Sequence, residues 1–240
     1  MLLNKNETSY KKLFETLIEL NGRPEPTLIK TDFEQASISA ARSFFPTARI
    51  SGCLFHLGQA IQRRIAEEGL RKYYNDNKPE IKYIKELMAL AFVKIEDIKP
   101  LFLELYSRQT LPIELKPIYD YFFRNYSEGI TTTRYPPELW SCYSTFVVER
   151  NIRTNNAVEG WHSIFKRMFA GASSSLPLLV HKLIEEQTFI EVKMWRLELD
   201  HVFERKVKYV KMEENVRAFL DTNEVTTIEL VEDFAKLLFY

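Results

Sequence analysis

An acidic residue in the second half of the chain has the surroundings of a catalytic ligand. Glu159 lies in the first turn of a predicted helix that runs to Phe169, between the apolar residues Val158 and Trp161. These neighbours would anchor the helix while the carboxylate points into a cleft. The same stretch also fits a capping box, Asn156-x-x-Glu159, in which the glutamate only accepts a hydrogen bond from the cap residue's N–H.

A second acid, Asp32, follows a short β-capable run at residues 27–31. If that run is a parallel strand, Asp32 lies at its carboxyl end, the edge at which open α/β sheets bind ligands. A structural role competes here too, because Asp32-x-x-Gln35 would cap the next helix. Both acids are therefore candidates for chemistry, and both capping alternatives remain open.

A cysteine and a histidine at metal-ligand spacing follow a second β-capable run. Cys53 and His56 resemble half of a zinc site, which needs four ligands, and Cys142 and His162 would have to complete it. The commoner arrangement is a buried cysteine beside a histidine that starts a helix. We therefore expect no zinc.

The elements that would carry these residues alternate at the start of the chain. Helical spacing at 6–20 and 33–45 and β-capable runs at 27–31 and 48–55 predict a parallel βαβ unit. The rest of the chain has helical periodicity, so the predicted fold class is α/β but mostly helical. Further helices are predicted at 57–68, 80–92, 96–106, 115–126, 176–199 and 226–240.

The composition describes a globular chain without a charge bias. Of 240 residues, 45% are hydrophobic, and Lys plus Arg equal Asp plus Glu at 33 each. Nucleic-acid binding would therefore need local basic patches. The candidate patches are interspersed with acids and also fit solvated helix faces. Their members are Arg63, Arg64, Arg71, Lys72, Arg150, Arg153, Lys166 and Arg167.

The cysteine content and the chain's apolar runs bear on its compartment. Two cysteines and no cationic and apolar leader favour a reducing compartment, so secretion is not expected. No apolar run has the length of a membrane span, so no membrane partner is expected either.

Three motifs occur in a fixed order along the chain. They are Thr31-Asp32-Phe33-Glu34, then Ala48-Arg49-Ile50-Ser51-Gly52-Cys53-Leu54-Phe55-His56-Leu57, and the stretch from Arg153 to His162. In this order and spacing they closely resemble the catalytic domain of Mutator-like element (MULE) transposases. The similarity extends from about Asn4 to about Gln187, and the three motifs together are far more specific than any one of them.

The resemblance implies a partial ribonuclease-H-like fold with a large α-helical insertion between the second and third acids of an Asp-Asp-Glu triad. Asp32 takes the position of the second acid and Glu159 that of the third. Both would be ligands of Mg²⁺ or Mn²⁺, because hydrolysis and strand transfer at phosphodiesters by two metal ions require several carboxylates.

Other residues of the motifs would support this site. By resemblance, Cys53 and His56 match the Cys-x-x-His motif of the family. Trp161 and His162 match the extension of its glutamate motif, and the adjoining Asn155 and Asn156 would act as supporting residues.

The chain departs from the family at the first acid of the triad, which belongs on an upstream strand. No aspartate precedes Asp32. We therefore expect weak binding of divalent ions and little or no strand cleavage by this chain alone. A sheet of about two parallel strands would also leave unpaired edges, for which another transposase chain could supply strands.

By resemblance, the function is that of a transposase domain fragment that acts on the DNA of transposon ends in the nucleus, or otherwise lies in the cytoplasm. The alternative is a non-catalytic module, recruited from a transposon, that binds DNA or protein. The expected division is a core at 1–56, a helical insertion at 57–135, a return to the core with the Glu159 helix and a long helix at 136–200, and a helical tail at 201–240.

Overall fold

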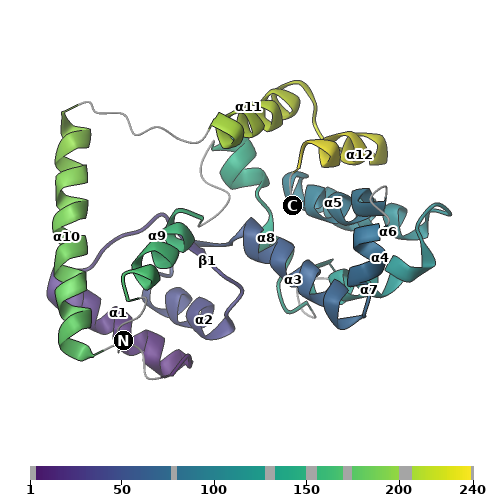
Figure 1. Ribbon diagram of the computed structural model, residues 1–240. Helices are drawn as coiled ribbons and strands as arrows, with labels where there is room; N and C mark the ends of the chain where they lie inside the picture. The colour runs from purple at the N-terminus through teal and green to yellow at the C-terminus, as the bar shows by residue number, and fades with distance from the viewer. Residues whose placement is uncertain are drawn as a thin grey trace. The chain divides into compact units, whose positions relative to one another are not determined.

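The computed structural model describes residues 4–76, 80–127, 133–149, 156–169, 175–199 and 207–238. The fold is mostly helical with one small parallel sheet (Figure 1). The chain divides into two compact units, each described here by itself. Unit 1 contains residues 1–155 and 214–240, and unit 2 contains residues 156–213.

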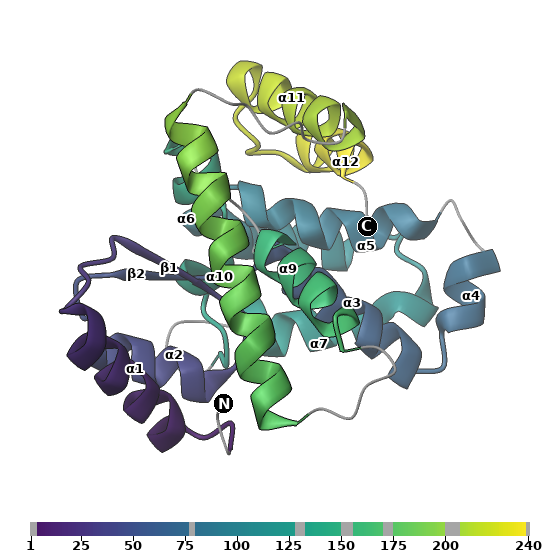
Figure 2. The ribbon, with the colours of Figure 1, turned by 60° about the vertical axis from the view of Figure 1, so that its left-hand side comes forward.

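Unit 1 begins with the βαβ arrangement that the sequence predicts. Helix α1 (Glu7–Asn21) starts where the Asn6 side chain accepts a hydrogen bond from the Ser9 N–H, as expected of a cap residue. Strand β1 (Leu28–Thr31), helix α2 (Gln35–Phe44) and strand β2 (Arg49–Gly52) follow. The strands pair in parallel, and α1 packs on α2 on one side of them (Figure 2).

Strand β2 is shorter than the run predicted at 48–55, which is a correction to the sequence analysis. Gly52 pairs with Thr31, the last residue of β1, and the Cys53 N–H donates to the Thr31 carbonyl at 2.8 Å. Beyond that point β1 offers no further partner, so the chain turns into helix α3 (Leu54–Glu67). Cys53 is the N-cap residue of this helix but makes no capping hydrogen bond through its side chain, and His56 lies in the first turn.

The middle of the chain, from α3 to α8, is a helical block. Its core is rich in aromatic rings that contact one another at centroid distances of 5 to 6 Å, for example Phe102 with Phe122 at 5.8 Å and Phe122 with Trp140 at 5.5 Å. Its helices after α3 are α4 (Arg71–Asp76), α5 (Ile81–Ala89), α6 (Ile95–Ser107), α7 (Lys116–Phe122) and α8 (Pro137–Trp140).

The predicted last helix is α12 (Ile228–Leu237), which packs on α5. The Thr227 side chain caps it by accepting a hydrogen bond from the Leu230 N–H. A buried ionic cluster joins α12 to the block, because Arg108 pairs with the fully buried Glu86 and also with Glu232 at 3.0 Å. The C-terminal helix is therefore part of the core of unit 1.

Unit 2 contains helix α9 (Asn156–Arg167), helix α10 (Leu176–Glu198) and the first part of α11 (Val207–Thr222). The long helix predicted at 176–199 is thus present, and the Ser175 side chain caps it. No described helix is both long and apolar enough to cross a membrane. The ribonuclease-H-like fold and the four-part division of the chain stay predictions.

Candidate functional site

Asp32 lies directly after β1, at the carboxyl end of the parallel strand pair. Its side chain is partly exposed. Strand β2 ends beside it, since Thr31 pairs with Gly52. The position is therefore the ligand-binding edge that the sequence predicts.

Asp32 does not cap helix α2, so the capping alternative for this residue is wrong. Helix α2 begins at Gln35, and its N-cap residue is Glu34, whose side chain makes no capping hydrogen bond. Asp32 is two residues too early to cap this helix. Glu34 instead accepts a hydrogen bond from the Tyr10 hydroxyl at 3.0 Å and lies 3.9 Å from the Lys5 ammonium.

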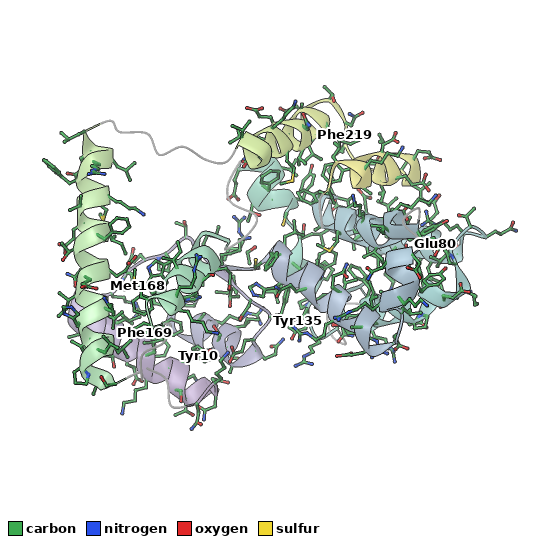
Figure 3. The ribbon with its side chains drawn as sticks, in the orientation of Figure 1. Tyr10, Glu80, Tyr135, Met168, Phe169 and Phe219 are labelled. Carbon is green, nitrogen blue, oxygen red and sulfur yellow. The ribbon has the colours of Figure 1, made fainter. Side chains whose placement is uncertain are left out.

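The backbone around Asp32 is held by contacts from distant parts of unit 1. The Tyr135 hydroxyl donates to the Phe33 carbonyl at 2.7 Å, and the two rings meet at 5.0 Å. The Gln35 side chain donates to the Arg134 carbonyl at 3.0 Å. Figure 3 labels Tyr135 and Tyr10, side chains that lie near the Asp32 end of β1.

Gly52 has a physical reason to be glycine. A Cβ atom at this position would lie 2.7 Å from the Cε1 and Cζ atoms of Phe33 and 3.2 Å from the Leu139 carbonyl oxygen. Such distances are too short for carbon atoms, so the Phe33 ring packs against β2 only because residue 52 lacks a side chain. The glycine of the second motif thereby positions the residue after Asp32.

The Cys-x-x-His motif lies at the junction of β2 and α3. Cys53 is fully buried, and His56 is half-buried in the first turn of α3. Cys142 is also fully buried in unit 1, whereas His162 belongs to unit 2 and is exposed. The motif thus orders the chain that follows β2, and a role in metal binding stays untested.

Sequence reasoning missed a lysine beside these residues. The Lys30 ammonium donates to the Ser51 hydroxyl at 2.8 Å across the strand pair, and burial lowers the pKa of Lys30 below its ordinary value. Its partner Ser51 lies opposite it in the register of the two strands. The available signal was a charged residue inside a β-capable run.

Glu159 lies in the first turn of α9, as predicted, and its side chain is partly buried. The Trp161 indole N–H donates to a carboxylate oxygen of Glu186 on α10 at 2.7 Å, and its ring stacks on Phe165 at 5.0 Å. Glu186 has an exposed fraction of only 7%. This buried contact between α9 and α10 fixes the helix that carries Glu159.

The supporting asparagines are only partly covered by the structure. Asn156 is the first residue of α9, and Asn155 lies outside the described residues. The capping box between Asn156 and Glu159 therefore remains an open alternative.

The divalent ion that the resemblance implies meets an incomplete set of ligands. Among the residues that the structure describes, no three His, Cys, Asp or Glu side chains are grouped so that they could hold a metal ion. Glu34, the acid next to Asp32, already binds Tyr10. Asp32 and Glu159 belong to separate units, so their meeting in one site stays a prediction.

Some side chains of the predicted basic patches form ion pairs or hydrogen bonds within the protein, and others are exposed to solvent. Arg64 pairs with Glu67 at 3.6 Å and with Glu68, and it lies over the ring of Tyr121. Arg167 donates to the carbonyl of its own helix. Arg63, Arg71, Lys72 and Lys166 are exposed, whereas Arg150 and Arg153 lie outside the described residues.

The parallel strand pair and the turn after Asp32 lie in a segment that is similar to a transposase domain. Residues 1–60, a quarter of the chain, match the family model of the MULE transposase domain, which supports a transposase-related domain. Asp32, Cys53 and His56 fall within the matched segment, and Glu159 lies outside it. Neither the curated proteins nor the solved structures contain a match to the chain.

Proposed function

We propose that this chain acts as the DNA-engaging part of a MULE-type transposase and does not cleave DNA by itself. The observation that carries the proposal is the position of Asp32, at the carboxyl end of β1 and free of the capping role, inside the segment that matches the transposase family. In that setting Asp32 is the second acid of the triad, and Glu159 on α9 is the third.

The residues around Asp32 support binding and positioning more than cleavage. Phe33, Gly52 and Tyr135 hold the strand end in one conformation, which is what a site for an ordered phosphodiester needs. Mg²⁺ or Mn²⁺, when bound, would neutralise charge on a phosphodiester and activate the attacking oxygen. Because the described residues supply no complete ligand group, we expect weak ion binding.

A partner chain is part of this proposal. The two-stranded sheet has the order β1-β2, so each of these strands pairs along one edge only within the described part of the chain. A two-stranded unit gains stability from further strands. Another transposase chain that adds a strand beside β1 would also bring carboxylates to Asp32.

The test combines a DNA-binding assay with a nicking assay on supercoiled DNA in Mg²⁺ or Mn²⁺. We expect binding without nicking above the background of a mock preparation. The matched variants are Asp32→Asn and Glu159→Gln, which remove charge at nearly constant volume. Nicking by the wild-type chain that both variants abolish would show an active enzyme and overturn the proposed inactivity.

The second candidate function is a binding module with no cleavage chemistry in any assembly. The exposed side chains of Arg63 and Arg71, which have no ion-pair partner among the described residues, favour it. The two functions separate when a full-length transposase of the family is added. Under the first, this chain contributes Asp32-dependent nicking to the mixture, and under the second it contributes none.

A further inference from the structure

A hollow of about 400 Å³ lies between α3 and α4 in unit 1. Its floor includes Ile65, which is buried, and Ala66. Its other lining residues are Gln62 and Arg63 from α3 and Arg71 and Asn75 from α4. Four hydrogen-bonding side chains, two of them cationic, therefore surround a small apolar base.

The turn between the helices builds this hollow. Gly69 adopts the left-handed conformation with φ 72°, and its N–H donates to the Ala66 carbonyl at 3.1 Å. The Leu70 N–H donates to the Ile65 carbonyl at 2.9 Å, and the Leu70 side chain packs against the core. These contacts form the usual glycine end of a helix, so α4 has a fixed position beside α3.

The two arginines of the hollow have no ion-pair partner among the residues that the structure describes. The neighbouring acids Glu67 and Glu68 are already bound by Arg64. Asp76, at the end of α4, is the remaining acid of the helix pair. An incoming anion therefore meets Arg63 and Arg71 without having to displace an existing ion pair.

The geometry points to a binding site for phosphate groups of a nucleic-acid backbone in this hollow. Arginine presents planar donors that match phosphate oxygens, and amide side chains commonly donate to the same oxygens. The inference rests on the proposed function, because that function supplies the nucleic acid.

The first test measures binding of the full chain to a labelled DNA duplex over a series of salt concentrations. Each lost phosphate contact lowers the slope of log K against log salt by about 0.9. We expect that loss for Arg63→Gln and again for Arg71→Gln, with about twice the loss in the double variant. Lys72→Gln is the matched control, since Lys72 is exposed on the same helix and does not line the hollow.

The outcomes separate the hollow from the proposed function. If the duplex binds and Lys72→Gln lowers the slope as much as Arg71→Gln, non-specific electrostatic attraction explains the binding. The proposed phosphate site in the hollow is then wrong. If the duplex does not bind at all, the DNA-binding part of the proposed function fails.

A second experiment then tests phosphate binding in the hollow independently of DNA binding. Inorganic pyrophosphate raises the melting temperature of a chain that binds it. A rise in the wild type that is absent in the Arg63→Gln/Arg71→Gln variant supports a phosphate site. An equal rise in both, or none in either, overturns it.

Discussion

Unit 1 and unit 2 hold their helices in different ways. In unit 1, apolar side chains from the strands and from most helices form one buried cluster that includes Trp140 and Phe122. Along the described parts of α9 and α10, the one buried residue is the charged Glu186. The Asp32 end of β1 therefore depends on packing, whereas the contacts described for the Glu159 helix are the hydrogen bond from Trp161 to Glu186 and the stacked rings of Trp161 and Phe165.

This difference has a consequence for the two predicted acids. A site residue set in a close-packed core keeps its position until the whole unit unfolds. A helix held by few buried contacts opens with a lower free energy. We therefore expect the surroundings of Asp32 to be the more rigid of the two, and the following substitutions probe each unit in turn.

The largest expected effect is in unit 1 and follows from replacing Arg108 with methionine. Glu86, with an exposed fraction of 0%, would remain buried without its cation. Breaking a buried ion pair in this way costs about 3–5 kcal/mol, to be measured as the free energy of unfolding in urea. Glu232→Gln is the control, because its side chain is 42% exposed and a loss of at most about 1 kcal/mol is expected.

A pair of glycine substitutions compares the units directly. Gly52→Ala places a methyl group 2.7 Å from the Phe33 ring, and such overpacking costs about 1–3 kcal/mol. Gly160→Ala, in α9, meets nothing within 4 Å, so helix propensity should raise stability by about 0.5–1 kcal/mol. Equal effects on thermal unfolding would contradict the contrast between a packed and an open environment.

The polar contact of unit 2 predicts a smaller and local effect. Glu186→Ala removes the acceptor of the Trp161 indole, and it also removes a buried charge, so we expect a net loss of about 1 kcal/mol. In a Trp195→Phe background, where the buried Trp140 is the other fluorophore, the Trp161 contribution to the emission should shift to longer wavelength. Glu186→Gln retains an acceptor and serves as control, and a shift of the same size in that variant would argue against the hydrogen bond.

The smallest effect concerns the tyrosine near Asp32. Burial, followed by the hydrogen bond to Glu34, raises the pKa of Tyr10 from 10.0 to about 12. Because the folded-state pKa lies above the unfolded value, this stabilisation is present below about pH 10 and is lost as the pH rises toward 12.

Alkaline ultraviolet titration checks this prediction. Tyr10→Phe should remove one phenol that ionises near pH 12. Glu34→Gln should move that ionisation toward pH 10, and Asp32→Asn should move it less, since Asp32 is the weakest of the causes. An Asp32→Asn effect larger than that of Glu34→Gln would place the Asp32 carboxylate closer to the phenol than the structure has it.

Local signals made much of unit 1 predictable from sequence. Helical spacing predicted helices that begin near residues 6 and 226, where the structure has caps at Asn6 and Thr227, and a strand, helix, strand order predicted the parallel pair. The Cys-x-x-His motif was assigned to the exit of a longer strand, because a β-capable run does not show where its partner strand ends. Strand β2 ends where its partner β1 ends, and the sequence of β2 alone does not show that position.

Other features depend on contacts between distant residues and had no local signal. Tyr135 reaches the Phe33 carbonyl across 102 positions. Glu186 lies in a helix whose pattern gave no reason to expect a buried carboxylate, and its partner Trp161 is 25 positions earlier. The association of Asp32 with Glu159 is of this kind and is still a prediction.

The two buried cysteines can report local unfolding of unit 1, because their thiols react only when they become exposed. Cys53 and Cys142 are unoxidised thiols with exposed fractions of 0%. A small alkylating reagent can reach Cys53 only when the start of α3 separates from the core. Mass spectrometry under native conditions can follow the rate of this modification. The rate therefore measures how often the junction of β2 and α3 unfolds locally.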